Sequence, residues 1–442
     1  VLVLVLTLIV AGGFAYGTTR IKGEVVIEEL LPYAHPYLKI MIEFSEVFGS
    51  GGSFVAIALE AKDGDVFKKP ILEKVQAIDQ EVALWPETYR ILTLSIGSRA
   101  TKVVRPVGEG EIRVKPLMWP DVPDTPESVR QLKKDIFSDP ILRGILVARD
   151  GTAAMVLTQF KEDISYARAN EILQDLASRY SDDETEVYLV GFPVLMGWIY
   201  GYKTQIMMVM VVSVILMIIV LFFSFQNFVG MVVPMCFGVI STAMGLGFIG
   251  WTGINFSPLQ YVLAFLVAAR MVSHSVQITH RYMEEMVESG DKEKACYETM
   301  RSMLLPNWAG VATDAAGFFI LIVVKIALMQ MVAIFMSFWM LTVALCGIVT
   351  PILCSYMPLA RASEAWVRKS QKMSWLDKLC AGAAEFSIGR GKSVLAVTAA
   401  GLLLFCVYQA TNLKIGDASP GSPLLWPDHR YNLDQGVVDK TF

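Results

Sequence analysis

Residues 203–224 read KTQIMMVMVVSVILMIIVLFFS and carry no charge after Lys203. A helix needs about 20 mostly apolar residues to cross a bilayer, so this stretch predicts a membrane-spanning helix. The composition agrees, because 54% of the 442 residues are hydrophobic and only 18% are charged. Both features predict an α-helical integral membrane protein. Windows of the same kind, which bring the expected number of spans to seven, lie at 1–16, 227–250, 257–280, 307–325, 330–356 and 393–411.

The Lys and Arg residues of the connecting segments predict the orientation of the spans. They concentrate in segments 281–305 and 357–392, whereas residues 251–256 carry none. Because short cytoplasmic loops are enriched in Lys and Arg, we expect both basic segments in the cytoplasm and the long segment 18–200 on the outer side. All six cysteines lie in predicted spans or cytoplasmic segments, so no disulfide framework is expected. The net charge of −4, with basic residues spread over many loops, argues against a nucleic-acid partner.

The outer segment alternates strand and helix patterns, which predicts an α+β domain. The order of the patterns favours a split β-α-β arrangement with helices on one face of a sheet. No GxSxG, HExxH or P-loop pattern occurs in the chain, and its acidic residues lack metal-ligand spacing. We therefore expect no enzyme, no catalytic residue, no cofactor and no metal site. The expected strands are 53–61, 99–106, 143–149, 153–160 and 186–191, and the expected helices are 125–137 and 161–180.

Two stretches of the chain look like copies of one element. After the first span the chain reads TTRIKGEVVIEELLPYAHPYLK, and after the last it reads TNLKIGDASPGSPLLWPDHRYNLD, so that His35 corresponds to His429. This repeat predicts that residues 1–392 form one unit and residues 393–442 begin a second, as in two-fold repeated transporters. Chance similarity between two short Pro- and Tyr-rich stretches is the alternative. Because the chain starts at Val1 inside an apolar run, we also expect its native start further upstream, with a cleaved signal peptide as the rival interpretation.

The expected organisation follows from these patterns. It comprises a first span at 1–17, an α+β domain at 18–200, spans two to six at 201–358, a cytoplasmic amphipathic helix and linker at 359–392, a seventh span at 393–411 and the start of a second outer domain at 412–442.

Five stretches follow one another in a characteristic order: 109–157, which begins EGEIRVKPLMWPDVPDTP; GFPVL at 191–195; RYMEEM at 281–286; GVATDAAGFF at 310–319; and SPLLWPDHRYN at 422–432. With this order of spans and outer domains, the chain resembles the resistance-nodulation-division (RND) superfamily. Within it, the chain is similar to the hydrophobe-exporter branch of MmpL lipid exporters and Patched-like sterol-sensing proteins. The resemblance implies a proton-driven pump of the bacterial inner membrane with a porter-like periplasmic domain. It also implies that the protein is a monomer or a homo-oligomer and that it can bind a periplasmic partner protein.

The fourth span departs from the family pattern. Members commonly carry Gly-Val/Ile-Asp-Tyr/Phe a few residues before an Arg-Tyr pair, and that Asp carries the proton. Counting back from Arg281-Tyr282, the Asp position falls on Ser273 and the aromatic position on His274. The usual acid is absent, so the resemblance alone does not supply a proton relay.

The same span carries a polar stripe of its own. Arg270, Ser273, His274, Gln277 and Arg281 stand at i, i+3, i+4, i+7 and i+11, which places them on one helix face. Arg270 is roughly 16 Å from Arg281 along the helix, near the bilayer centre. A central Arg costs about 2.5–3.5 kcal/mol, so it should face protein or water and have an acidic partner.

The fifth span offers that partner as Asp314, which lies roughly 12 Å past Pro306 from the same side. Small residues around Asp314 allow close helix approach, so we predict an Arg270–Asp314 pair with His274 beside it. In one interpretation the pair is a permanent structural contact in which nothing titrates. In the other, His274 or Asp314 takes up a proton during transport, and His274 is the better candidate because an Asp opposite an Arg is a poor proton acceptor.

The leading hypothesis is an RND-type secondary transporter that moves a hydrophobic or amphiphilic compound or a lipid from the inner membrane toward the periplasm. Its expected partners are membrane lipids, the hydrophobic substrate and a missing second half of the same protein. The alternative is a transport-inactive, sterol-sensing-like subunit that binds lipid or holds partner proteins, in which the absent acid reflects a lost proton relay.

Overall fold

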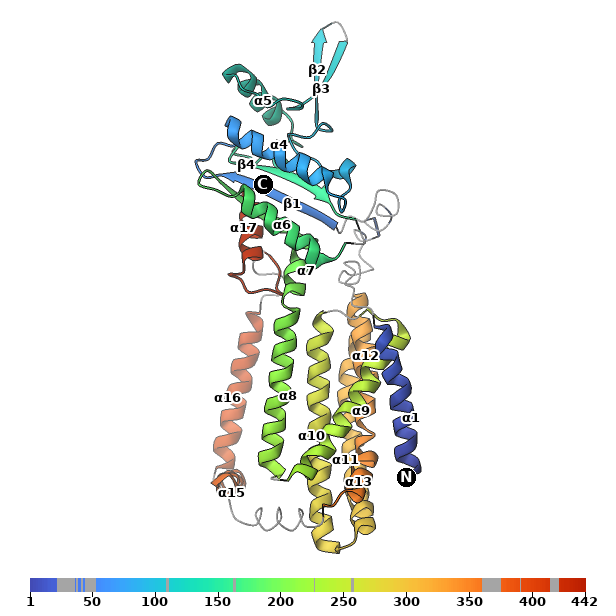
Figure 1. The fold of residues 1–442 in the computed structure, drawn as a ribbon. Helices are drawn as coiled ribbons and strands as arrows, with labels where there is room; N and C mark the ends of the chain where they lie inside the picture. The colour runs from blue at the N-terminus through green and yellow to red at the C-terminus, as the bar shows by residue number, and fades with distance from the viewer. Residues whose placement is uncertain are drawn as a thin grey trace. The chain divides into compact units, whose positions relative to one another are not determined.

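A computed structural model of the protein describes residues 1–21, 53–108, 111–161, 164–225, 227–255, 258–359, 375–389, 391–413 and 421–442, together with Pro36, Lys39, Ile40 and Glu43. The chain divides into two compact units (Figure 1). We call residues 1–38 and 205–413 the helical bundle, and residues 39–204 and 414–442 the sheet domain. His35, residues 360–374 of the expected cytoplasmic helix and linker, and residues 414–420 of the expected repeat lie outside the described residues.

The helical bundle consists of long apolar helices. Among the described residues, six stretches are long and apolar enough to cross a membrane: Leu2–Arg20, Phe192–Phe225, Gly230–Thr252, Lys292–Val323, Ala327–Tyr356 and Lys392–Thr411. The protein is therefore a multi-pass helical membrane protein. The helices are α1 (Leu2–Gly17), α8 (Lys203–Phe225), α9 (Phe228–Thr252), α10 (Pro258–Ser289), α11 (Lys292–Phe319), α12 (Ala327–Val343), α13 (Cys346–Tyr356), α15 (Trp375–Ile388) and α16 (Lys392–Thr411).

Helix α10 contains the polar stripe and is not among these six stretches. Its 32 residues nevertheless measure roughly 48 Å at 1.5 Å per residue, enough to cross a bilayer. It packs against α9, α11, α12 and α13. The fourth span thus stays a prediction, although its helix lies among helices that qualify.

The contact between α1 and α9 depends on glycine. A Cβ atom at Gly247 would lie 1.9 Å from the carbonyl oxygen of Phe14, and one at Gly250 would lie 1.7 Å from that of Gly17. Only glycine allows this approach, as at other close helix crossings in membranes. The crossing fixes the first span against the centre of the bundle.

The segment 281–305, expected as a loop, is instead almost entirely helical. Helix α10 continues to Ser289 and α11 begins at Lys292, with a turn at Gly290, whose φ is +66°. Arg281 pairs with Glu284 at 3.2 Å and with Glu285, and such i,i+3 and i,i+4 pairs stabilise an exposed helix. The charges therefore extend the helices beyond the apolar windows.

The sheet domain is built on a three-stranded sheet of order β4-β1-β5, formed by β1 (Phe54–Ala61), β4 (Ala153–Gln159) and β5 (Thr185–Gly191). Because β4 and β5 are both antiparallel to β1, they are parallel to each other, and α6 (Tyr166–Tyr180) connects them. This is a split β-α-β arrangement. The other elements are α4 (Lys69–Leu84), the 3₁₀ turn η3 (Arg90–Leu92), the paired strands β2 (Lys102–Gly108) and β3 (Glu111–Pro116), α5 (Pro126–Ser138), α7 (Phe192–Gly201) and α17 (Arg430–Thr441).

One expectation for this domain is wrong. The run 143–149 is not a strand: its chain turns at Gly144, where φ is +94°, and it forms only the isolated bridges Arg143–Val147 and Val147–Ala154. The helices of segment 18–200 pack on one face of the sheet, and α17, from the last segment of the chain, covers the other. Ile57 and Leu59 pack with residues of α4 and α6, whereas Ala58, which points to the opposite face, packs with Val438 of α17.

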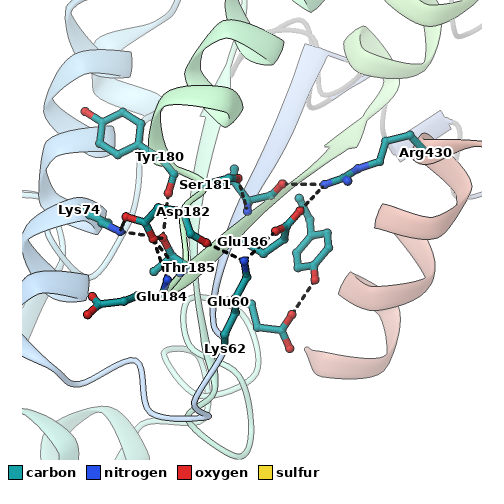
Figure 2. A network of polar contacts seen from close by, with 12 residues as sticks. Glu60, Lys62, Lys74, Tyr180, Ser181, Asp182, Glu184, Thr185, Glu186 and Arg430 are labelled. Atoms are coloured by element: carbon teal, nitrogen blue, oxygen red, sulfur yellow. Dashed lines mark hydrogen bonds and ion pairs between the residues drawn. The ribbon is translucent and has the colours of Figure 1, made fainter.

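Helix α17, from the last segment of the chain, completes the sheet domain. Figure 2 shows Arg430 of α17 reaching Glu186 of β5, with 3.0 Å between Nη2 and Oε1. Asp434, only 4% exposed, accepts a hydrogen bond from the backbone N–H of Leu189 at 3.2 Å. Because β5 is an edge strand, some of its backbone N–H and C=O groups have no partner strand, and α17 supplies hydrogen-bond partners to them. Residues 430–441 thus belong to the same compact unit as 39–204.

The substitution Asp434→Ala is expected to lower the free energy of unfolding of the sheet domain by about 1–3 kcal/mol, because the buried Leu189 N–H loses its acceptor. A urea titration of the full chain in detergent, followed by tryptophan fluorescence, measures the change. The matched control is Asp439→Ala on the same helix, whose exposed carboxylate contacts only Gln435 at 2.7 Å among the described residues. It should change stability by no more than about 0.5 kcal/mol. Equal effects of the two substitutions would show that α17 is not held by this contact.

Candidate functional site

Helix α10 has two polar sides with different surroundings. On one side Ser275 and Thr279 are fully buried, and Ser275 Oγ lies 3.0 Å from Thr350 Oγ1 of α13. On the other side Arg270, Ser273 and Gln277 of the polar stripe are exposed at the surface of the bundle. The buried side fixes the rotation of α10, so the stripe is held on the open side.

The stripe meets α11 at an ion pair. Arg270 Nη2 lies 2.9 Å from Asp314 Oδ2, and Nε donates a hydrogen bond to the same oxygen at 3.0 Å. The side chains are 51% and 31% exposed, so the pair sits at the border of the open face. Because two nitrogens of the Arg270 guanidinium reach the same oxygen, the described residues leave Asp314 Oδ1 without a hydrogen-bond donor.

His274, one turn after Arg270, faces α11 at a second polar contact. Its Nδ1 lies 2.9 Å from Oδ1 of Asn307. The Asn307 amide nitrogen in turn donates to the carbonyl oxygen of Ala344 at 3.2 Å. With the amide nitrogen so used, the amide oxygen accepts, and His274 Nδ1 must be the donor. Nε2 then carries the lone pair of the neutral ring, and within the described ranges no hydrogen bond reaches it.

Ala344 marks a break between two helices. Helix α12 ends at Val343 and α13 begins at Cys346, and together they form the apolar stretch Ala327–Tyr356, which agrees with the expected span 330–356. The carbonyl oxygen of Ala344 accepts from the backbone N–H of Gly347 at 3.2 Å, and the Asn307 amide is its second donor. His274 is thereby connected through Asn307 to the point where the chain changes from α12 to α13.

Helix α11 is fixed in position by its other side. Val311 and Ala315 are buried in the core with Trp339, and Ser337 Oγ donates to the carbonyl oxygen of Ala315 at 3.0 Å. A Cβ atom at Gly310 would lie 3.8 Å from His274 Cε1, so His274 packs over the turn that separates Asn307 from Asp314.

The structure thus brings together Arg270, Asp314, His274 and Asn307. It does not join Ser273 or Gln277 to them: these two share the open face, but no hydrogen bond links them to the group in the part of the chain described. Asn307 is the residue that sequence reasoning missed. Its position seven residues before Asp314, on the same helix face, was the available signal.

The arrangement combines fixed charge with a group able to titrate. Arg270 and Asp314 neutralise each other, so together they add no net charge to the face. Contact with lipid chains would destabilise a half-exposed ion pair. We therefore expect water or protein, rather than lipid, to cover this face of the bundle. Imidazole changes charge near neutral pH, so His274 can exchange a proton there. Within the described ranges, no three His, Cys, Asp or Glu side chains come together as metal ligands.

A comparison with curated proteins gave no match. In contrast, the model of the MMPL family matches residues 115–380, more than half of the chain. The match includes α10 with its stripe, α11 with Asp314 and much of the sheet domain. This family consists of transporters rather than enzymes. The chain therefore belongs to the MMPL family of RND-type membrane transporters.

Proposed function

We propose that the protein is a secondary transporter that moves a hydrophobic or amphiphilic compound or a lipid from the inner membrane toward the periplasm, and that protons drive it. The observation that carries this proposal is the group Arg270–Asp314 with His274 on an open face of the bundle. Intramembrane ionisable groups of this kind are typical of proton pathways.

His274 is the proposed proton acceptor. Its Nδ1 proton is held by Asn307, so the ring has one defined basic atom, Nε2. Ser273 and Gln277 on the same face could order a chain of water that leads to it. Arg270 and Asp314 fix the charge around the ring, and neither needs to change its protonation state.

The proposed link to movement runs through Asn307. A charged imidazole repels the neighbouring guanidinium of Arg270 and strengthens its own hydrogen bond to the Asn307 oxygen. Asn307 also donates a hydrogen bond to Ala344 between α12 and α13. Proton uptake by His274 therefore changes the hydrogen bonding at the point where these two helices meet. A helix break at a proton site provides the two-state element that coupling requires.

The alternative function is a transport-inactive subunit that binds lipid or holds partner proteins. The absent family acid at Ser273 favours it, because the described part of α10 contains no carboxylate at the usual place. In that case the Arg270–Asp314 pair would only hold α10 and α11 together.

Reconstitution distinguishes the two functions. The full chain in liposomes, with NBD-labelled phosphatidylglycerol in the membrane and an imposed pH gradient, should move the label between leaflets faster than protein-free liposomes do. Dithionite quenching of the exposed label measures the rate. We expect a protonophore to return the rate to the protein-free value. A rate that the protonophore leaves unchanged would contradict proton coupling, and no rate above that of protein-free liposomes would favour the subunit.

A further inference from the structure

The sheet domain contains a groove of about 790 Å³ that the polar stripe does not involve. It lies between the C-terminal half of α4, the turn η3 and the segment that leads into β2. Its volume is within the range of sites that hold small organic ligands. All of its lining residues belong to the sheet domain and to the described part of the chain.

One side of the groove is apolar. Leu84 at the end of α4 is 69% exposed, Ile91 of η3 is 84% exposed, and Trp119 is 38% exposed. Single exposed apolar residues are ordinary, but these three line one groove. Together they provide a surface suited to a hydrocarbon chain.

The other side of the groove is basic. Arg90, Arg99 and Lys102 line it and are exposed, and within the described residues none of them forms an ion pair with a carboxylate. Other cations of this domain are paired, as Arg179 is with Glu81. Arg99 lies over Trp119, with its Cζ 5.3 Å from the ring centroid, so the basic and apolar sides meet at this contact.

Asp79 is the single acidic residue among those that line the groove in the described chain, and its side chain is buried. It is 6% exposed, and its Oδ1 accepts a hydrogen bond from Ser95 Oγ at 2.7 Å. Burial raises the pKa of the Asp79 carboxyl, and the hydrogen bond from Ser95 lowers it. The groove therefore presents three exposed basic side chains and one buried acidic side chain next to an apolar surface.

We propose that this groove binds an amphiphile with an anionic headgroup, such as a phosphate monoester. Arg90, Arg99 and Lys102 contact the headgroup, and Leu84, Ile91 and Trp119 contact the first part of the hydrocarbon chain. Charge-assisted hydrogen bonds from Arg and Lys to phosphate oxygens provide the selectivity for an anion. The inference rests on the proposed transport function and narrows its substrate class to anionic amphiphiles.

Binding is tested on the full chain in nanodiscs, by calorimetric titration with three probes. Dodecyl phosphate has both features, dodecyltrimethylammonium has the chain with the opposite charge, and inorganic phosphate has the anion alone. We expect saturable binding of dodecyl phosphate, at least about tenfold weaker binding of inorganic phosphate, and none of the cationic amphiphile above empty nanodiscs. If inorganic phosphate binds as tightly as dodecyl phosphate, the groove is a site for free phosphate. If the cationic amphiphile binds as tightly as dodecyl phosphate, the probes partition into lipid. Either result would overturn the proposal.

A matched pair of variants locates the site. The triple variant Arg90→Gln, Arg99→Gln, Lys102→Gln should weaken dodecyl phosphate binding by about tenfold or more. The control Arg113→Gln, Lys115→Gln, Lys134→Gln removes the same charge from exposed positions that do not line the groove, and should bind as the unmodified protein does. Equal affinities of the two triple variants would place binding elsewhere.

The same titration separates this inference from the proposed function, because it requires neither a gradient nor movement of lipid. Gradient-driven transport with unchanged binding in the groove variant would contradict the groove alone. Saturable binding that the groove variant loses, in a protein that moves no lipid under any gradient, would contradict transport alone.

Discussion

Asp314→Asn is expected to abolish gradient-driven lipid movement and to lower the yield of folded protein. The substitution removes the negative charge 2.9 Å from Arg270 Nη2, and leaves the guanidinium on its own at the open face of the bundle. An uncompensated Arg near the bilayer centre costs on the order of 2.5–3.5 kcal/mol. Size-exclusion chromatography of the solubilised protein measures the yield, and the dithionite assay measures transport.

Two further variants separate the charge balance from the transport step. Arg270→Gln with Asp314→Asn removes both charges, so the yield of folded protein should recover, while transport stays absent because the fixed field around His274 is lost. The exchange Arg270→Asp with Asp314→Arg restores a pair of opposite charges and should also recover the yield. If Asp314→Asn alone leaves both folding and transport intact, the pair has neither role.

Much of the bundle could be predicted from the sequence, because apolar length is a strong signal. The windows at 203–224 and 393–411 match α8 and α16 within a few residues. The ends of α10 and α11 could not be placed by the same signal. There, charged side chains pair along the helix surface, and a segment rich in Lys and Glu has the composition of a loop although it is helical.

The sheet domain shows where local patterns fail. The run 143–149 is apolar enough for a strand, but the positive φ at Gly144 turns the chain at the second residue of the run, which composition does not reveal. The position of α17 depends on contacts with Glu186 and Leu189, more than 240 residues earlier in the chain. No periodicity within residues 430–441 could indicate that edge of the sheet.

The candidate site was partly accessible from the sequence. Counting 1.5 Å per residue from the charged helix ends puts Arg270 and Asp314 at similar depths, and the structure has them in contact. Asn307 was not accessible in this way. Its importance comes from the break at Ala344, and that break lies in an apolar stretch, MLTVALCGIV, without a proline or charge to mark it.

His274→Phe is expected to uncouple lipid movement from the pH gradient and to lower the gradient-driven rate by about tenfold or more. Phenylalanine is close to histidine in size and has no basic nitrogen, so the Nε2 site is lost. The substitution also removes the hydrogen bond to Asn307, and His274→Asn controls for this, since its amide nitrogen stands where Nδ1 stood and can still donate to the Asn307 oxygen but does not titrate. If His274 carries the proton, both variants lose coupling; if the contact with Asn307 is what matters, His274→Asn retains it.

The matched control is His280→Phe, which removes a histidine from the same helix near the end of the stripe. The ring of His280 packs against Phe225, with centroids 4.4 Å apart, and an aromatic replacement keeps this contact. His280→Phe should therefore transport under a gradient as the unmodified protein does. A loss of coupling in both His280→Phe and His274→Phe would show that aromatic substitution in α10 is harmful in itself. An unchanged gradient dependence in His274→Phe would exclude this ring as the proton acceptor, because the variant has no basic nitrogen at this position.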